Sequence, residues 1–334
     1  MDDGDPPEIS LPTTLQETEG PLVSVVTPTY EDARYIERAL ESLSEQTYAN
    51  LEVVVVDSSG VEWLETLLDP LEWARYVYEP PNGVAAARNR GLDEAEGEVI
   101  AFLDADDFYA PAKLERQVAA LDGEADVVYS NVTVIEPDGS RTELSALPVE
   151  DPDRHHVAFF RSGHGVPTVT VAARRECFED ERFDERLQAR EDPHLWVRLF
   201  RNGIPAMILE SLAFKRRRAD SLTADPDMMY ENELAAIDDL VERIPELRSY
   251  RVERERMAAY RYGKHLFQAG RTAEARRVFL DVLRSGKRDA QTLALFGLSL
   301  LPAGNRRAFR LLERVQQSGL RALRGGSSGA ASGD

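Results

Sequence analysis

The sequence of 334 residues contains one cysteine, Cys177, and only five histidines. A single cysteine excludes an intramolecular disulfide and any zinc cluster that is built on several thiolates. The histidines stand at positions 155, 156, 164, 194 and 265, and they form no HExxH motif or other close metal-ligand spacing. Neither residue type therefore points to a metal centre.

Lysine is also scarce, because only four of the 40 basic residues are lysines, while acidic residues number 60. The resulting net charge of −20 argues against nucleic acid as a partner, since phosphate binding needs a basic surface. An acidic, lysine-poor surface suits a protein dissolved in high salt, where screening shortens the reach of repulsion. We therefore hold a halophilic source as a hypothesis, with a base composition that favours arginine as the alternative.

Long hydrophobic runs are missing as well. The longest apolar stretch near the end, LALFGLSLLP, is too short to span a bilayer. The first residues, MDDGDPPEIS, are acidic and rich in proline, unlike a signal peptide. We expect a cytoplasmic protein, with peripheral contact at the inner face of a membrane as an open option.

What the sequence does contain is an alternation of apolar strands and amphipathic helices. Strands are predicted at 22–28, 51–57, 74–79, 98–104, 125–135 and 206–214, and helices at 35–46, 83–97, 110–121 and 193–202. This order predicts an α/β fold with a mainly parallel, Rossmann-like sheet and helices on both faces. In such sheets ligands bind beyond the carboxyl ends of the strands.

Acidic residues gather at these strand ends, most densely in the run Asp104-Ala105-Asp106-Asp107. One interpretation is turn chemistry, because Asp favours turns and helix caps. The other is that the carboxylates of this run hold a divalent cation such as Mn²⁺ or Mg²⁺, which takes oxygen ligands and carries a diphosphate. The first strand is followed by PTYEDA, without a GxGxxG or Walker A glycine loop, so a dinucleotide site is not predicted and a metal is more necessary.

The chain is predicted to have four parts. Residues 1–20 and 325–334 are expected to be disordered, 21–223 form the α/β domain, and 224–324 form a helical region. Residues 241–324 hold 19 Lys and Arg against 8 Asp and Glu, so the charge changes sign there. A loose tetratricopeptide-like helix hairpin is carried by Gly263, Leu266, Gly270, Ala275 and Phe279.

Four motifs in order resemble glycosyltransferase family 2. They are SVVTPTYEDARYIERALESLSEQTY, VVVVDSS, NGVAAARNRGLDEAEGEVIAFLDADD and the ED of AREDPHLWVRL, and together they cover about residues 21–223. The resemblance implies a GT-A fold and an inverting transfer of one sugar from a nucleotide-diphosphate donor. It also implies Mn²⁺ or Mg²⁺ as cofactor.

The resemblance also implies roles for residues on the donor side. Asp57 would accept from the base, most often uracil, although Ser58 replaces the second acid that most relatives carry. Asp104 would contact the ribose, and Asp106, together with Asp104, would hold the metal. The basic run 215–218 would approach the diphosphate, with Arg216 favoured and a solvated basic run as the alternative. The remaining nucleotide-side residues would be Pro28, Thr29, Tyr30, Glu31 and Arg88, the last with a polar helix face as its alternative.

On the acceptor side, the resemblance makes Asp192 the general base and Glu191 an acceptor or donor-sugar contact. Because Asp192 precedes Pro193, a helix N-cap is its alternative role. Asp107 is a second-rank metal ligand or an acceptor contact. His194 is a weaker candidate for an acceptor contact, with a surface helix position as its alternative.

The expected function is a metal-dependent, inverting, hexosyltransferase-type enzyme of glycan biosynthesis or protein glycosylation, with UDP-sugars favoured. The acceptor would be a glycan, with a polyprenyl-phosphate-linked form as an option, since basic helices are attracted to anionic lipid. A processive polymer synthase is not expected, because no QxxRW signature or transmembrane helix occurs. The alternatives are a non-catalytic module that binds a nucleotide-sugar or glycan, and a nucleotidyltransferase.

Overall fold

The computed structural model describes residues 11–16, 18–30, 35–163, 165–218 and 225–301. The chain divides between Arg251 and Val252 into two compact units, and each is treated by itself below. The boundary predicted at residue 223 and the tail predicted at 325–334 lie outside the described residues.

Four parallel strands build the first half of the sheet. They are β1 (Val23–Thr29), β2 (Leu51–Asp57), β3 (Ala74–Tyr78) and β4 (Val99–Phe102), in the spatial order β3-β2-β1-β4. Their valine-rich sequences suit strands that are covered on both faces. In the register, Thr29, Asp57 and Tyr78 form one row across the sheet at its carboxyl edge. The strand ends therefore meet where a ligand is expected.

The second half of the sheet is mixed. β8 (Ala172–Arg174) is antiparallel to β4 and to β6 (Val127–Ile135), and β9 (Pro205–Arg216) is parallel to β6. Two short strands complete it, because β5 (Phe108–Tyr109) pairs with β9, and β7 (Arg141–Leu144) pairs with β6. The β5–β9 pairing brings the end of β9 next to the acids that follow β4.

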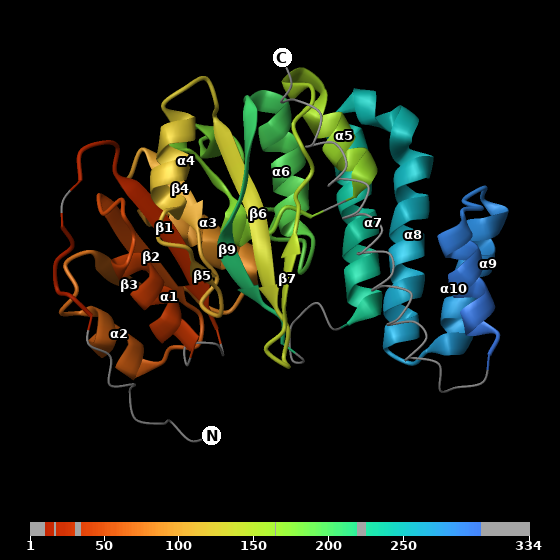
Figure 1. The fold of residues 1–334 in the computed structure, drawn as a ribbon, viewed down its shortest axis with the longest axis horizontal. Helices are drawn as coiled ribbons and strands as arrows, with labels where there is room; N and C mark the ends of the chain where they lie inside the picture. The colour runs from red at the N-terminus through yellow and green to blue at the C-terminus, as the bar shows by residue number, and fades with distance from the viewer. Residues whose placement is uncertain (1–10, 17, 31–34, 164, 219–224, 302–334) are drawn as a thin grey trace, which may run out of the picture. The chain divides into compact units, whose positions relative to one another are not determined.

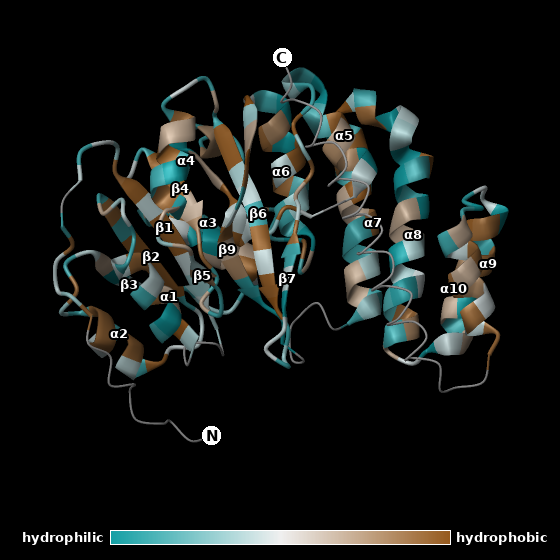
Figure 2. Ribbon diagram, in the orientation of Figure 1, coloured by the Kyte–Doolittle hydropathy of each residue, from teal (hydrophilic) through white to brown (hydrophobic). Residues whose placement is uncertain are grey.

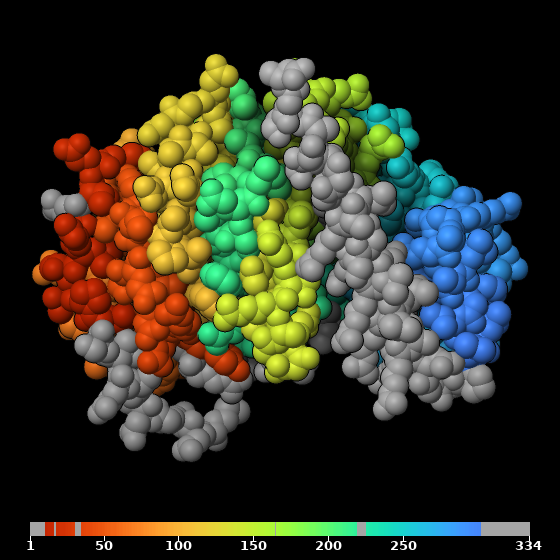
Figure 3. Space-filling model, in the orientation of Figure 1, coloured from red at the N-terminus to blue at the C-terminus, as the bar shows by residue number. Residues whose placement is uncertain are grey.

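Helices cover both faces, as the sequence predicts (Figure 1). On one face, α1 (Ile36–Ser44), α2 (Glu62–Leu68) and α4 (Lys113–Leu121) pack on a core that includes Val25, Val53 and Val55. On the other face, Val54 and Val56 contact Ala87 of α3 (Val84–Glu94), and Phe102 contacts Trp196 of α6 (Glu191–Asn202). The central strands are correspondingly hydrophobic in Figure 2. In Figure 3, α4 (yellow) lies beside β9 (green), with which it is in contact.

Helix α3 lies unusually close to the sheet, and Gly91 is the reason. A Cβ at Gly91 would lie 2.3 Å from Cγ1 of Val26 in β1, which is far inside van der Waals contact. Because α3 also carries Arg88, this close approach sets the distance of that side chain from the strand ends.

The expected elements are confirmed, with shifted ends. β2 has its predicted bounds, while the helix expected at 83–97 ends at Glu94, because Ala95 is extended. α2 and the short strands were not predicted. The first unit further contains α5 (His155–Ser162), α7 (Pro226–Arg243) and 3-10 turns at Pro152–Arg154, Thr168–Thr170, Arg175–Phe178 and Pro245–Tyr250. α7 therefore belongs with the α/β domain.

The N-terminal segment differs from the expected disorder over 1–20. Trp73 donates from Nε1 to the carbonyl of Pro12 at 2.8 Å, and Thr18 Oγ1 accepts from the backbone N–H of Asn50 at 2.9 Å. Leu11 and Leu15 pack against the core. Residues 11–16 and 18–20 therefore form part of the domain surface, because their apolar and hydroxyl groups find partners there.

The second unit is helical, with α8 (Arg251–Gln268) running into it, followed by α9 (Thr272–Arg284) and α10 (Ala290–Ser299). The predicted hairpin is present, since Leu266, Ala275 and Phe279 share one core and Gly270 takes the turn at φ 85°. A Cβ at Gly263 would meet the Phe279 ring at 2.7 Å, so glycine permits the close helix contact. Among the helices of the described residues, none is both long and apolar enough to cross a membrane.

Candidate active site

The acids after β4 occupy a tight turn between β4 and β5. The backbone N–H of Asp107 donates to the carbonyl of Asp104 at 2.9 Å, so turn chemistry is present, as one interpretation of the sequence proposes. The side chains, however, do not cap this turn. They meet cations from α3 and from the basic run 215–218 at the end of β9. With Glu191 and Asp192 they form what we call the acidic cluster: Asp104, Asp106, Asp107, Glu191 and Asp192.

Arg88 joins the two halves of this cluster. Its Nη2 lies 2.7 Å from Oδ1 of Asp104, and its Nη1 lies 2.7 Å from Oε1 of Glu191. Arg88 is 4% exposed, and its guanidinium lies over the ring of Phe183, 5.4 Å from the centroid. Burial opposes ionisation of Asp104, but the charges of Arg88 and Lys215 outweigh it and lower the pKa of that carboxyl. Arg88 therefore binds two motifs that are far apart in the sequence.

The basic run 215–218, which begins within the end of β9, supplies the other cations, although not through the side chain of Arg216. Lys215 Nζ lies 3.5 Å from Oδ2 of Asp107 and 3.8 Å from Oδ2 of Asp104, and Arg218 Nη1 lies 3.4 Å from Oδ2 of Asp106. Arg216 instead places its guanidinium over the ring of Phe108, 5.4 Å from the centroid, and only its backbone N–H reaches Asp107. Lys215 and Arg218 thus face the acids.

Asp107 is the most deeply buried acid after β4, at 1% exposure. Burial, followed by the charges of Asp106 and Asp104, raises its pKa to about 7 in spite of Lys215. Such a carboxyl sits behind the acids that remain partly exposed. Its predicted acceptor contact is therefore not evident in this structure.

Glu191 and Asp192 open helix α6. The N-cap position belongs to Arg190, whose φ of 67° is left-handed, so the alternative role of Asp192 as N-cap is wrong. Asp192 is half-buried, and Thr168 Oγ1 lies 3.4 Å from its Oδ2. Burial and the neighbouring Glu191 raise the pKa of Asp192 to about 7, while Arg190, Arg88 and Lys215 act in the opposite direction. A carboxyl that titrates near neutrality is suited to moving a proton.

Asp57 lies buried at the end of β2 with its carboxylate already engaged. It accepts from the backbone N–H groups of Ser59, Gly60 and Val61 at 2.8–3.0 Å, and from the hydroxyls of Ser59 and Tyr76 at 2.5 and 3.1 Å. Burial and the charge of Asp57 raise the pKa of Tyr76 to about 12. A carboxylate offers about four lone-pair sites, so a nucleobase donor would have to replace one of these partners.

The end of β1 provides a hydroxyl and an aromatic ring. Within the described residues, Thr29 Oγ1 is buried without a hydrogen-bond partner, and Pro28 precedes it in the strand. Tyr30 is 51% exposed beside them. Glu31 lies outside the described residues. Asn89 of α3 donates to the carbonyl of Phe183 and accepts from its backbone N–H, each at 3.0 Å.

His194 is placed differently from both interpretations of the sequence. It is 1% exposed and its Nε2 lies 2.8 Å from Oδ2 of Asp239 in α7. It is therefore open neither to an acceptor substrate nor to solvent. Burial lowers its pKa to about 4. Asp184, His194 and Asp239 form a group of three potential metal ligands. Arg186 binds both carboxylates and Arg243 also binds Asp239, so arginine side chains compensate the charge of the group without a metal ion.

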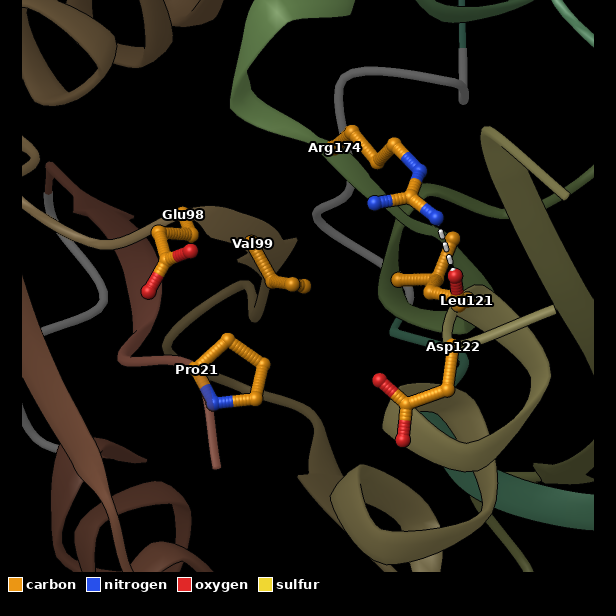
Figure 4. A pocket seen from close by; sticks show the side chains of 6 residues that line it. All are labelled: Pro21, Glu98, Val99, Leu121, Asp122 and Arg174. Carbon is orange, nitrogen blue, oxygen red and sulfur yellow. Dashed lines mark hydrogen bonds between the residues drawn. The ribbon is translucent and has the colours of Figure 1, made fainter. Parts of the chain in front are cut away.

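A surface hollow lies at the opposite edge of the sheet (Figure 4). Its lining residues are Pro21, Glu98, Val99, Leu121, Asp122 and Arg174. Val99 starts β4, whereas the acidic cluster follows the end of that strand, so the two sites lie at opposite strand ends. Arg174 donates there to the carbonyl of Leu121, the last residue of α4, and to that of Ala125. We assign the hollow no part in the chemistry.

Comparisons with known proteins agree with this arrangement. The chain matches the family model described as Glycosyl transferase family 2 over residues 24–192. It is 33% identical to the amylovoran biosynthesis glycosyltransferase AmsB of Erwinia amylovora, over 57% of this chain and 68% of that protein. It is 30% identical to the uncharacterized glycosyltransferase RC0461 of Rickettsia conorii over 59% of this chain, and it spans about a third (34%) of that relative.

Solved structures share the fold. The S. aureus protein TarS 1-349 in complex with UDP-GlcNAc gives a TM-score of 0.55 at 20% identity, covering 83% of this chain and 79% of that one. The mannosyltransferase PcManGT of Pyrobaculum calidifontis, in complex with GDP-Man and Mn²⁺, gives 0.55 at 19% identity, covering 96% and 90%. At these identities the likeness is one of fold, which is the GT-A fold.

The family match begins in β1 and ends at Asp192, so it includes every member of the acidic cluster. The order of these motifs, the sheet that brings them together and the sequence matches agree with one another. The chain is a GT-A glycosyltransferase and belongs to glycosyltransferase family 2.

Proposed function

We propose that this protein is a metal-dependent, inverting glycosyltransferase that moves one sugar from a nucleotide-diphosphate donor to an acceptor hydroxyl. The observation that carries the proposal is the Arg88 bridge. It joins Asp104, at the expected donor site, to Glu191, which neighbours the expected base Asp192. Donor and base groups are thereby held in one constellation.

The donor side fits a divalent cation. Asp104 and Asp106 offer carboxylate oxygens that remain partly exposed, which are the ligands that Mn²⁺ and Mg²⁺ prefer. Lys215 and Arg218 now stand against these acids, so the site already attracts positive charge. When bound, a cation would neutralise the diphosphate as it leaves. Lys215 and Arg218 would then release their carboxylate partners and pair with phosphate oxygens of the donor instead.

On the acceptor side, we assign the general base to Asp192. In an inverting displacement, the acceptor oxygen bonds to the anomeric carbon while the bond from that carbon to the diphosphate breaks. The hydroxyl proton goes to Asp192, whose pKa of about 7 lets the carboxylate form near neutral pH and still hold the proton. Glu191, fixed by Arg88, would contact the acceptor or the donor sugar.

We favour UDP as the nucleotide and a glycan as the acceptor. TarS in complex with UDP-GlcNAc supports UDP, whereas PcManGT with GDP-Man and Mn²⁺ keeps GDP as an alternative. Asp57 would accept from the base after releasing one donor of its loop. A polyprenyl-phosphate-linked acceptor would place the enzyme in the cytoplasm, at the inner face of the membrane.

Titration calorimetry tests the donor side. We expect one of UDP, GDP and CDP to bind the wild type only with Mn²⁺, at low or high KCl, and Asp106→Ala to lose this binding. Asp69→Ala is the matched control, because Asp69 is an exposed acid at the end of α2, and it should bind like the wild type. If no nucleotide binds the wild type under any condition, the proposed transfer is wrong. If a nucleotide-sugar binds but never turns over with any acceptor, a non-catalytic binding module is favoured.

A further inference from the structure

We infer that helix α7 positions the loop that leads into α6, and that Glu233 acts through Arg190 as a positioning residue for Asp192. The inference rests on the proposed function, because it assumes that Asp192 is the base. The family match ends at residue 192, so α7 (Pro226–Arg243) lies beyond the segment that the family model describes.

Three side chains of α7 hold the loop that leads into α6. Asn232 Oδ1 accepts from the backbone N–H of Gln188 at 2.8 Å. Glu233 Oε1 lies 3.5 Å from Nη2 of Arg190, the residue directly before Glu191. Asp239 binds Arg186 and His194, each at 2.8 Å, so contacts precede and follow the Glu191–Asp192 pair. The pair is therefore enclosed between points of attachment to α7.

The backbone at Arg190 needs such support. Among the described residues, it is the one non-glycine position with a positive φ, at 67°. A side-chain-bearing residue persists in this region only where its surroundings hold it there. In the Arg190–Glu233 pair, Glu233 is buried and Arg190 is largely buried, with side-chain exposures of 8% and 15%. Glu233 thus fixes the residue whose conformation sets the start of α6.

Helix α7 is itself well anchored. Pro226 occupies its first turn, and the carboxylate of Asp225 accepts from the backbone N–H groups of Asp227 and Met228. Along the helix, Ala236, Ile237, Leu240 and Val241 are buried. An anchored helix can transmit a fixed position to the loop, whereas a loosely held one could not.

The test compares Glu233→Gln with Glu242→Gln, the same change at an exposed position of α7. We expect Glu233→Gln to lower kcat about 10- to 100-fold, because a misplacement of about 1 Å can cost a factor of 100. Affinity for the nucleotide donor, measured by calorimetry, should stay as in the wild type, because the donor acids are untouched. Glu242→Gln should change neither quantity.

Two further variants keep the result decisive. If Glu233→Gln is unfolded at the assay temperature, Asn232→Ala takes its place, and a folded Asn232→Ala with wild-type kcat overturns the inference. A parallel loss of kcat and donor affinity also overturns it, since that indicates general disruption. Asp192→Asn distinguishes a failure of the proposed base from a failure of the role inferred for α7. If Asp192→Asn keeps wild-type turnover, the proposed base is wrong, whereas if it is inactive and folded Glu233→Gln is unaffected, only the role of α7 fails.

Discussion

At the scale of single residues, the site is a set of carboxylates whose behaviour is decided by their neighbours. Asp104 and Asp192 are both partly buried, yet their pKa values move in opposite directions. Asp104 has Arg88 at 2.7 Å, whereas Asp192 has Glu191 beside it and, within the part of the chain that the structure describes, forms no ion pair with a basic side chain. Two acids with separated pKa values can divide the labour between charge binding and proton transfer.

The proton-transfer role predicts a pH profile. The base must be deprotonated, so kcat/KM should rise as pH increases through the pKa of Asp192, about 7 in the free enzyme, and fall below it. The profile would be measured with a saturating metal concentration. Asp107 also titrates near 7, so Asp107→Asn is the control, since its amide oxygen can still accept from Arg216. If the rise of kcat/KM near pH 7 disappears in Asp107→Asn, the titrating group is Asp107 and not Asp192.

Predictability also differs from residue to residue. The acids at the strand ends could be found from the sequence, because apolar runs mark where each strand stops. The basic partners could not, since Lys215 and Arg218, and not Arg216, face the acids. The β6–β9 pairing changes register at Asn131, and such an irregularity resets which side chains face the site without leaving a local pattern. His194 was misjudged because the helix that buries it follows about 30 residues later.

At the scale of elements, α3 carries the most demanding contact. The sequence predicts the existence of α3 but places its end at 97, three residues beyond Glu94. The bounds of β2 follow from its nearly continuous apolar run, whereas the seven residues of α2 give too short a pattern to predict a helix. Periodicity does not tell how closely a helix approaches its sheet. Gly91 against Val26 supplies that information, and it also determines where Arg88 can reach.

Replacing Gly91 by alanine should therefore destabilise the fold. The new methyl would lie 2.3 Å from Val26 Cγ1, so α3 must move outward, at a cost of about 1–3 kcal/mol in the free energy of unfolding. Urea denaturation would measure it, and Val26→Ala in the same chain should recover part of the loss relative to the sum of the single changes. Gly123→Ala is the control, because its nearest neighbour would lie at 3.5 Å. Equal effects of the two glycine changes would contradict the argument.

At the scale of the whole molecule, charge is divided between the units. The chain carries −20 overall, yet residues 252–301 contain 10 basic and 5 acidic side chains. The same segment has exposed apolar side chains at Val252, Leu293, Leu300 and Leu301. Basic and apolar groups together suit an anionic membrane surface. The halophilic source stays a prediction. In the high salt of such a source, the attraction between the basic side chains and an anionic membrane would be weaker, because salt screens charges.

Liposome flotation tests the membrane contact. We expect binding to vesicles that contain phosphatidylglycerol at low KCl, less binding at high KCl, and none to pure phosphatidylcholine. Changing the exposed residues Arg277, Arg284 and Arg288 to glutamate should abolish binding, since each basic residue near an anionic surface contributes about 1 kcal/mol. Asp69→Ala should bind as the wild type does. Failure of the wild type to bind at any salt concentration would remove the membrane from the proposed function.

The shared guanidinium of Arg88 has a thermodynamic consequence. It pairs with Asp104 and at the same time acts to lower the pKa of Asp192. Donor binding at Asp104 and protonation of Asp192 therefore both depend on the charge of this one guanidinium. Linkage requires that this influence be mutual: whatever changes the charge at Asp104 changes the proton affinity of Asp192, and the proton changes the ligand's affinity by the same factor. Donor binding should then be accompanied by proton uptake from the buffer or proton release to it. The protonation state of Asp192 would therefore differ between the free enzyme and the enzyme with its donor bound.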